Sequence, residues 1–113
     1  MLAKINRLTK DKDFNNAFKK GRSSYDDMTG IKTAANGLAN NRFGILVSTK
    51  ISKKAAIRNK IKRRVREAIK KYINKLRLGN DLVIICLPGI LKKEYKEIEQ
   101  SLSYHFKKLR ILK

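Results

Sequence analysis

One segment restricts the fold more than any other part of the chain: AAIRNKIKRRVREAIKKYINKLR, Ala55 to Arg77. Its apolar residues recur at helical spacing and predict an amphipathic helix of roughly 23 residues, about 35 Å long at 1.5 Å per residue. Ser52 is placed to cap the beginning of this helix, and Gly79 follows its end. The apolar stripe consists of Ile57, Ile61, Val65, Ala68, Ile69, Tyr72, Ile73 and Leu76. Because such a stripe must be buried against another element, the sequence predicts a layered fold.

The residues before this segment predict a short helix followed by strands. Thr9 is a good N-cap, two acids favour the first turns, and Gly21 is placed to end the helix. Its apolar side would hold Leu8, Phe14, Ala17 and Phe18. Strands are predicted over 31–35 and 42–48, separated by an Asn36-Gly37 turn and an asparagine-rich loop. The run over 42–48 is nearly continuously apolar, which is typical of a strand covered on both faces.

After the basic segment, the sequence predicts one more strand and a closing helix. The strand covers Leu82–Leu87 and is stopped by Pro88-Gly89. The helix starts at about Leu91 and carries an apolar face of Leu91, Tyr95, Ile98, Leu102, Phe106 and Leu109. The predicted fold is an α/β (α+β) two-layer sandwich, with one mixed sheet of about four strands and three helices in the order α-β-β(-β)-α-β-α. The length predicts a single domain over residues 1–113.

The charge balance points to a polyanionic partner. Lys and Arg number 29 against nine Asp and Glu, so the formal net charge is +20. The Ala55–Arg77 segment alone carries ten basic residues and a single acid, Glu67. Like charges three or four residues apart on a helix repel one another, and phosphates would relieve this repulsion. One flank of the helix holds Arg58, Asn59, Lys62, Arg66 and Lys70, and Lys60, Arg63, Arg64 and Lys71 lie further round.

Three kinds of polyanion are possible partners: an anionic membrane surface, duplex DNA and RNA. The membrane is disfavoured because the apolar stripe is needed to cover the neighbouring strands. DNA is disfavoured because no helix-turn-helix pair, zinc spacing or heptad zipper is present. RNA is therefore moderately favoured. The start, MLAKINRL, lacks the apolar stretch of a signal peptide, and Leu82–Leu87 is far shorter than a membrane span, so a soluble cytoplasmic chain is expected.

No residues are assembled for acid–base, nucleophilic or metal chemistry. His105, the only histidine, is expected at the surface or the edge of the core. Asp26 and Asp27 are adjacent and fit a turn better than a metal site. Cys86 lies in an apolar run and is interpreted as a small core residue. The sequence therefore predicts neither a catalytic residue nor a metal ligand in the protein.

The run Ile57-Arg58-Asn59-Lys60-Ile61-Lys62-Arg63-Arg64-Val65-Arg66 resembles the Arg-Asn-Arg signature helix of the bacterial ribonuclease P protein component. The resemblance covers most of the chain. It includes Asn6-Arg7-Leu8, Asp13-Phe14 with Phe18 and Gly21, Arg42-Phe43-Gly44-Ile45, Val47-Ser48, Gly79-Asn80-Asp81 and the strand ending at Pro88. Two positions depart from the pattern: Lys60 replaces the second Arg of the triple, and Ser52 stands where glycine is common. Lys60 keeps the charge and loses the planar fork.

The resemblance implies a protein cofactor of a catalytic RNA. In this family the RNA holds the active site and its Mg²⁺ ions and cuts the 5′ leader from precursor tRNA, and no further protein partner is required. The protein binds that RNA through the signature helix, here Lys53, Lys54, Arg58, Asn59, Lys60, Lys62, Arg63 and Arg66. It holds the single-stranded leader in a cleft between the sheet and the first helix. The resemblance also implies a left-handed crossover through the long helix, whereas such connections are right-handed in about 98% of cases.

Two interpretations compete for Phe14 and Phe18. An aromatic pair at i,i+4 on a short helix is usually core. The resemblance instead assigns both rings to the leader cleft, where aromatic faces stabilise stacked bases. Tyr25 follows on a strand along which the resemblance is weaker, and its role stays open. The alternative function is a non-catalytic, basic structural RNA-binding protein such as a ribosomal protein, which would not require this aromatic pair.

Overall fold

A computed structural model describes residues 2–113 of the chain. Short 3-10 turns lie at Lys4–Asn6, Ile73–Lys75 and Pro88–Lys92. The main elements follow in the order α1 (Asp11–Lys20), β1 (Arg22–Tyr25), β2 (Thr29–Ala35), β3 (Arg42–Leu46), α2 (Ala55–Tyr72), β4 (Asn80–Cys86) and α3 (Tyr95–Lys108). The predicted element order and α+β class are confirmed, with β1 as the additional strand.

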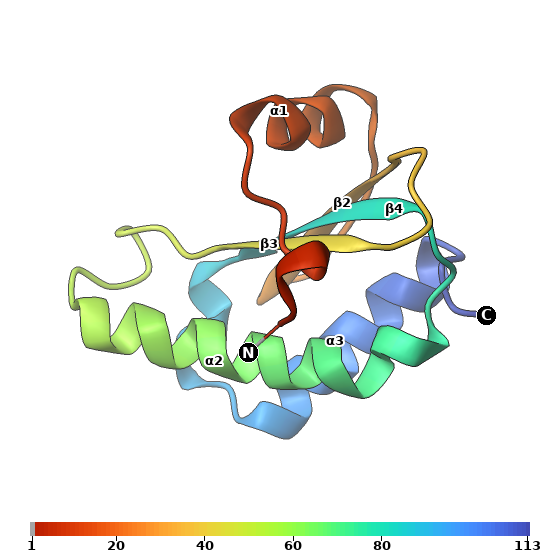
Figure 1. Ribbon diagram of the computed structural model, residues 1–113. Helices are drawn as coiled ribbons and strands as arrows, with labels where there is room; N and C mark the ends of the chain where they lie inside the picture. The colour runs from red at the N-terminus through yellow and green to blue at the C-terminus, as the bar shows by residue number, and fades with distance from the viewer. Residues whose placement is uncertain (1) are drawn as a thin grey trace.

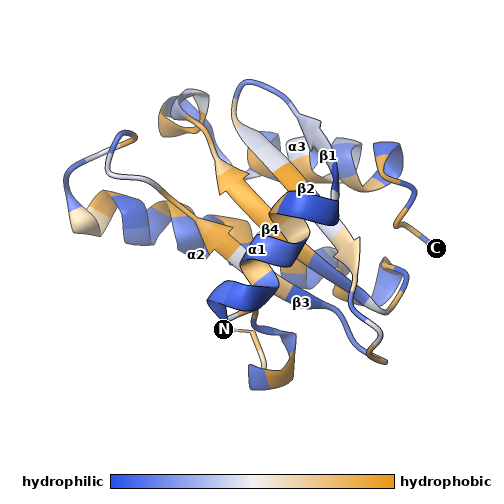
Figure 2. Cartoon of the chain, turned by 90° about the horizontal axis from the view of Figure 1, so that it is seen from above, coloured by the Kyte–Doolittle hydropathy of each residue, from blue (hydrophilic) through white to orange (hydrophobic). Residues whose placement is uncertain are grey.

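The four strands form one mixed sheet in the order β1-β2-β4-β3. β2 is antiparallel to β1 and β4, whereas β3 is parallel to β4 and is joined to it through α2. Figure 1 shows α1 on one face of the sheet and α2 with α3 on the other. In Figure 2 the arrows of β3 and β4 point to the upper left. When the picture is turned so that both arrows point upward, β4 lies to the right of β3 and α2 lies behind the sheet. The crossover is therefore left-handed, as the resemblance implied.

The main core lies between the sheet and the pair α2 and α3. Alternate residues of β2 and β4, such as Ile31 and Ile84, face this layer and are fully buried. The apolar stripe of α2 packs here as predicted, since Val65 and Ile69 are fully buried. Cys86 is also part of this core, and burial raises the pKa of its thiol to about 12. A neutral thiol at this position acts as a small apolar residue, as expected.

The opposite face of the sheet is only partly covered. α1 buries Leu8, Ala17 and Val83 in a second, smaller cluster, with Phe14 half-buried at its edge. The close approach of α1 depends on Gly44, because a Cβ at this position would lie 2.5 Å from the Phe14 ring. Figure 2 shows α1 crossing above the middle of the sheet, with strand ends extending beyond it. Part of this sheet face therefore remains open beside α1.

Both N-caps differ from prediction. Lys10 and Lys54 occupy the N-cap positions of α1 and α2, and neither side chain caps its helix. Thr9 precedes the α1 cap by one residue. The Ser52 hydroxyl accepts a hydrogen bond from the Lys54 N–H over 3.2 Å and so shapes the turn before α2.

Two helix boundaries and one strand also differ. α2 ends at Tyr72 rather than Arg77, because the chain turns to pair with the C-terminus, where the Arg77 N–H donates to the Ile111 carbonyl. α3 begins at Tyr95, after a Glu94–Glu97 capping box, so Leu91 lies outside it and is exposed. β3 ends at Leu46 rather than Ser48 and is the edge strand of the sheet, and of its five residues only Phe43 and Gly44 are buried.

Candidate nucleic-acid interface

The basic residues of α2 divide into two groups according to their partners. Near the C-terminal end, Lys70 lies 3.5 Å from Glu67 and Lys71 lies 3.4 Å from Glu99. Among residues 2–113, no basic side chain of α2 before Lys70 forms an ion pair with a carboxylate. Arg58 and Arg64 donate only to the backbone carbonyls of Ser52 and Lys93. The first three turns of α2 thus retain their positive charge, which a partner must neutralise.

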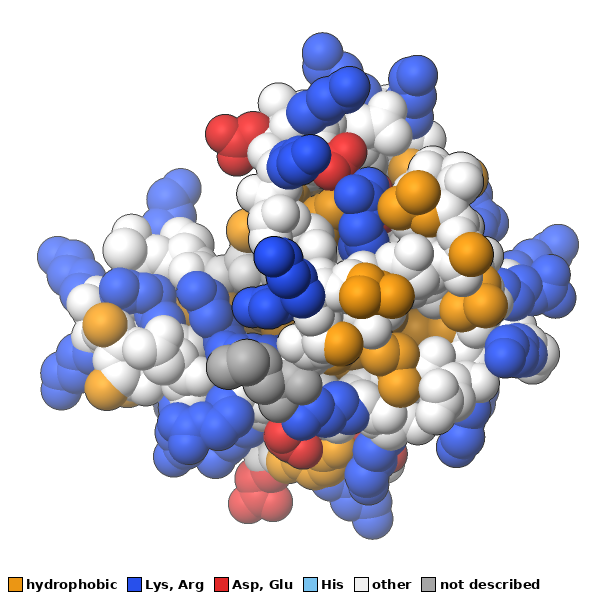
Figure 3. Space-filling model, in the orientation of Figure 1, with side chains coloured by type: hydrophobic (Ala, Val, Ile, Leu, Met, Phe, Trp, Pro, Cys, Tyr) orange, Lys and Arg blue, Asp and Glu red, His pale blue; other side chains and the backbone are white. Residues whose placement is uncertain are grey.

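The predicted RNA-binding residues lie together at the beginning of α2. Figure 3 shows Lys and Arg side chains gathered over this end of the helix, at the left of the view. Lys53 and Lys54 are exposed on the approach to α2. Arg58, Lys62 and Arg66 are half-buried and one helical turn apart, while Asn59, Lys60 and Arg63 are exposed. The side chains of α2 therefore form two rows, a half-buried row beside the sheet and an exposed row that faces solvent. Both rows are able to contact phosphates.

Phe14 and Phe18 have different surroundings. Phe18 is 38% exposed at the open part of the sheet, and the Lys32 ammonium lies 5.4 Å from its ring centroid. Phe14 packs over Gly44 and belongs partly to the second cluster. Tyr25 is 46% exposed and its ring lies across Gly30, on the same sheet face as Lys32. The face beside α1 thus presents two accessible aromatic rings and a cation.

Lys32 was not among the predicted site residues. It lies on β2, where it pairs with Val83 and points to the same face as Phe18. The only sequence signal is its position in the period-two alternation between Ile31 and Thr33, which are both buried. That signal places Lys32 on the other face without indicating its aromatic neighbour.

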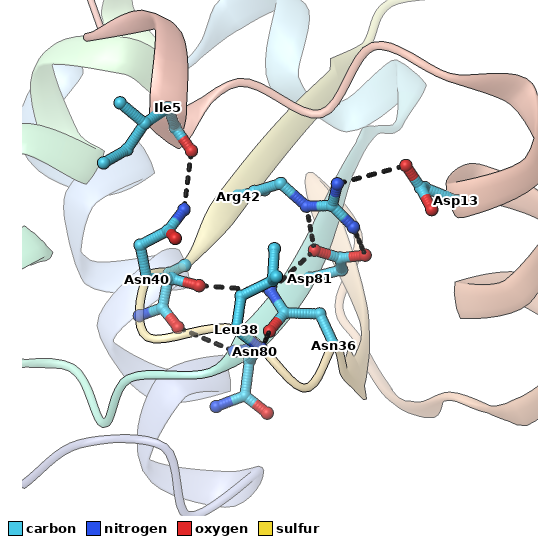
Figure 4. Close-up of polar contacts among 9 residues, drawn as sticks. Ile5, Asp13, Asn36, Leu38, Asn40, Arg42, Asn80 and Asp81 are labelled. Carbon is cyan, nitrogen blue, oxygen red and sulfur yellow. Dashed lines mark hydrogen bonds and ion pairs between the residues drawn. The ribbon is translucent and has the colours of Figure 1, made fainter.

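A half-buried ion-pair network around the buried Asp81 fixes α1 over the sheet (Figure 4). Arg42 donates from Nε and Nη2 to the two carboxylate oxygens of Asp81, each over 2.8 Å, and its Nη1 lies 3.1 Å from Asp13. Asn36 Nδ2 donates to the same Asp81 carboxylate over 2.9 Å. The hydrogen bonds to Asp81 raise the pKa of Arg42. Since Asp13 lies in the first turn of α1, this network sets the distance between Phe14, Phe18 and the sheet.

The asparagine-rich loop holds the N-terminal segment at the edge of the sheet. Asn40 Nδ2 donates to the Ile5 carbonyl over 2.7 Å (Figure 4). Asn6 Nδ2 donates to the Asn41 carbonyl over 2.8 Å. The Leu8 N–H donates to the Phe43 carbonyl over 2.9 Å, which places this segment beside β3. The loop therefore positions the residues that precede α1.

His105 was expected at the surface or the core edge, but it is fully buried. Its Nε2 faces the Thr29 carbonyl at 3.1 Å, and because a carbonyl only accepts, Nε2 carries the hydrogen. Nδ1 then accepts a hydrogen bond from the Ser24 hydroxyl over 2.7 Å. Asp26 lies at 3.4 Å from Nε2 and accepts from Ser101 over 2.6 Å. These hydrogen bonds link His105 and Ser101 of α3 to β1 and β2, and the imidazole is too deeply buried to contact a substrate.

This buried histidine should make the protein sensitive to acid. Burial lowers the pKa of His105 below its ordinary value of 6.5. Below that value the unfolded chain binds a proton that the folded chain excludes, so the free energy of unfolding falls on acidification. The loss should reach at most about 1.4 kcal/mol for each pH unit below 6.5 while the folded imidazole stays neutral. Denaturant unfolding at pH 7.5 and 5.5 measures this loss in the free energy of unfolding.

The matched variant is His105→Gln, which does not titrate. Its unfolding free energy should be lower than that of the natural chain at pH 7.5 and should change less between the two pH values. Asp26 contributes to the free energy of unfolding in a different, more acidic pH range. Burial opposes its ionisation, but hydrogen bonds from Ser101, Thr29 and Met28 lower its pKa overall, so that its contribution is lost only below about pH 3.8. Equal pH dependence of the two proteins would contradict the role of His105.

Asp26 and Asp27 form the turn expected of them. Asp26 Oδ1 accepts from the N–H groups of Met28 and Thr29 over 2.9 and 2.8 Å, whereas Asp27 is exposed. Within residues 2–113, no three His, Cys, Asp or Glu side chains come together in a way that could hold a metal ion. In the same part of the chain, no helix is both long enough and apolar enough to cross a membrane.

Comparison with known proteins identifies the family. The model of the ribonuclease P family matches residues 2–110. The chain is 37% identical over 108 residues to the ribonuclease P protein component of Brevibacillus brevis, with 95% of this chain and 85% of the relative covered. It is 32% identical over 107 residues to that of Alkaliphilus metalliredigens, with 95% and 96% covered.

Solved structures agree with these relatives. The ribonuclease P protein of Staphylococcus aureus has 30% sequence identity and a TM-score of 0.87, with 96% of this chain and 98% of that chain covered. The protein from Thermotoga maritima has 29% identity and a TM-score of 0.78, with 87% and 92% covered. The match extends over the sheet, the basic helix and the helix that carries the two phenylalanines. The chain therefore belongs to the ribonuclease P protein family.

Proposed function

We propose that this ribonuclease P subunit binds the catalytic RNA through the beginning of α2 and binds the 5′ leader of precursor tRNA on the open sheet face beside α1. The protein assists the removal of the leader, which gives the mature 5′ end of the tRNA. The phosphodiester bond is hydrolysed in the RNA, with Mg²⁺ held mainly by that RNA. All of residues 1–113 form one RNA-binding domain that acts in the cytoplasm, and no second protein is required.

The observation that carries this proposal is the unneutralised charge at the beginning of α2. Arg58, Lys62 and Arg66 form one row along the helix, and their neighbours within residues 2–113 supply no carboxylate partner. Arg forks pair well with phosphate oxygens, and a structured RNA supplies phosphates at high density. The apolar stripe of α2 is already buried in the core, so this helix offers only its charged surface to a partner.

The open sheet face has the properties of a single-strand site. Phe18 and Tyr25 are accessible aromatic rings, and Lys32 lies next to the first of them. Aromatic faces stack on any base, which suits a leader whose sequence differs from one precursor to the next. Phe14 is less accessible and contributes at the base of this face. Family membership disfavours the alternative of a structural ribosomal protein.

Phe18→Ala tests the leader site. The holoenzyme with this variant should bind precursor tRNA more weakly by about 1–3 kcal/mol, because one stacked base is lost. Mature tRNA, which has no leader, should bind almost as before, and assembly with the catalytic RNA should be unchanged. Direct binding measurements with both tRNAs give the comparison. Tyr104→Ala is the matched control, since Tyr104 is an exposed aromatic residue on α3.

Phe14→Ala should behave differently from Phe18→Ala. Phe14 packs on Gly44 and the second cluster, so its truncation should lower the melting temperature as well as precursor binding. Phe18→Ala should leave the melting temperature nearly unchanged. If Phe18→Ala weakens binding of precursor and mature tRNA equally, the leader assignment is wrong.

A further inference from the structure

Three exposed aliphatic side chains lie on one surface of the molecule, which we call the aliphatic patch: Ile5, Leu38 and Leu78. They belong to the N-terminal turn, to the loop between β2 and β3 and to the segment before β4, and they are 63%, 46% and 62% exposed. Figure 3 shows hydrophobic side chains gathered on the face turned toward the viewer. A single exposed aliphatic residue needs no explanation, whereas a cluster built from three segments indicates an interaction site.

Hydrogen bonds of the asparagine-rich loop hold the three segments of the patch against one another. Asn40 Nδ2 donates to the Ile5 carbonyl over 2.7 Å, and the Leu38 N–H donates to Asn36 Oδ1 over 2.8 Å (Figure 4). The Asn36 N–H in turn donates to the Gly79 carbonyl over 2.9 Å, directly after the third aliphatic residue. Because the backbone beneath the patch is already fixed, a partner loses little binding free energy in ordering it.

The rim of the aliphatic patch is positively charged. Lys4, Arg7 and Arg77 are exposed and belong to the same segments, and no carboxylate within residues 2–113 forms an ion pair with them. Residues 3–7, 36–41 and 76–79 contain no Asp or Glu. Asp81, the acid that follows them, is buried and already bonded to Arg42. An apolar centre with a cationic rim suits an occupant whose apolar side chains are flanked by carboxylates.

The patch lies away from the first turns of α2. Figure 1 shows the loop between β2 and β3 and the segment before β4 at the right of the view, whereas α2 begins at the left. The patch can therefore be occupied while the proposed RNA-binding residues of α2 are engaged.

Two other occupants fit this surface less well. A second copy of the chain would bring another net charge of +20. Stable interfaces also bury about 1,200 Å² or more in total, which three aliphatic side chains from each copy cannot supply. RNA would be attracted by the rim, but Ile and Leu side chains have no flat face on which a base can stack.

We propose that the aliphatic patch binds an acidic segment of another protein. The apolar side chains of that segment lie on Ile5, Leu38 and Leu78, and its carboxylates meet Lys4 and Arg77. This contact goes beyond the proposed function, which requires no second protein. The partner joins the ribonuclease P subunit to another protein and takes no part in the cleavage of precursor tRNA.

Three synthetic peptides of equal length test the inference on the isotopically labelled full chain. The probe is a peptide of Glu in which Leu recurs at every third or fourth position. One control peptide has Ser in place of each Leu and keeps the charge, and the other has Gln in place of each Glu and keeps the apolar side chains. Amide and methyl resonances of the protein report where each peptide binds.

We expect the probe peptide to shift the methyl resonances of Ile5, Leu38 and Leu78 in the natural chain. The peptide with Ser should leave these resonances unchanged, because charge alone does not bring it to the patch. The peptide with Gln should bind more weakly than the probe. This difference should disappear at about 1 M salt, where the screening length is only about 3 Å.

Serine variants of the natural chain measure the contribution of single side chains. Leu38→Ser and Leu78→Ser should each weaken binding of the probe peptide by about tenfold or more, because one aliphatic side chain is lost from the contact. Leu91→Ser is the matched control, since Leu91 is 45% exposed on the 3-10 turn Pro88–Lys92, outside the patch. It should bind the probe like the natural chain, and thermal melts confirm that all three variants fold.

Several results would overturn the inference, and the first needs only the natural chain. If the probe leaves the three methyl resonances unchanged, or if the peptide with Ser binds as tightly, the patch does not bind an acidic segment. Equal affinities of Leu38→Ser and Leu91→Ser would lead to the same conclusion. If the catalytic RNA alone shifts these resonances and prevents binding of the probe, the patch belongs to the RNA interface. If the natural chain sediments as a dimer and Leu38→Ser as a monomer, the occupant is a second copy.

Discussion

The affinity of this protein for the catalytic RNA should fall on the order of 10³–10⁵-fold when the salt concentration rises from 50 to 200 mM. The net charge of +20 and the α2 cations before Lys70, which have no carboxylate partner within residues 2–113, motivate this expectation. If six to ten phosphates are engaged, their condensed counterions are released on binding, and added salt opposes that release. The measurement is a series of dissociation constants with Mg²⁺ held constant. A nearly flat plot of log affinity against log salt would exclude a charge-dominated interface.

The slope of this plot can be assigned to residues. Joint replacement of Arg58, Lys62 and Arg66 by Ala should reduce the slope by about 2–3, because each lost phosphate contact removes roughly 0.7–0.9. The matched control removes the same charge elsewhere, by replacing the exposed Lys92, which ends the 3-10 turn before α3, and the exposed Lys96 and Lys107 of α3. The control should retain most of the slope. Equal losses from both sets would mean that overall charge is sufficient and that the row on α2 is not the binding site.

The sequence predicts the α2 surface well because burial of the apolar stripe determines which residues of this helix face outward. The apolar stripe must be buried, which fixes the rotation of the helix, and Val65 and Ile69 are indeed in the core. Once the rotation is known, the flank with Arg58, Lys62 and Arg66 is known as well. The apolar run Leu82–Leu87 and the stop at Pro88-Gly89 similarly place β4. Elements with strong periodicity are therefore predicted together with their exposed residues.

Features that depend on distant parts of the chain are not predicted. His105 looks like an ordinary polar residue of a surface helix, and its burial depends on Ser24 and Thr29, which are 76 or more positions away. The i,i+4 spacing of Phe14 and Phe18 indicates a shared side, but Gly44 and Lys32 give the two rings different surroundings. Local patterns carry no information on these contacts.

The ion-pair network at Arg42 links single elements to the tertiary fold, because it joins residues from three segments and positions α1. Asp81 is 3% exposed, and its carboxylate depends on the Arg42 fork and on Asn36 for its hydrogen bonds. A buried carboxylate that loses its cation keeps the full cost of desolvation. Asp13 would lose the same partner, and with it α1 would lose its polar connection to the sheet. The stability of the fold and the position of α1 over the sheet thus depend in large part on one guanidinium.

Arg42→Ala should therefore lower the free energy of unfolding by about 3–5 kcal/mol, a large part of the 5–15 kcal/mol typical of a small domain. Denaturant unfolding measures this loss, with Arg22→Ala as the exposed control that should change stability by no more than about 0.5 kcal/mol. Adding Asp81→Asn to Arg42→Ala should restore part of the loss, because the second change removes the unpaired charge. Strictly additive losses would show that Arg42 and Asp81 do not act as a pair. Where the Arg42→Ala protein still folds, the displaced α1 should also weaken binding of precursor tRNA more than binding of mature tRNA, since Phe18 would no longer be held over the open sheet face.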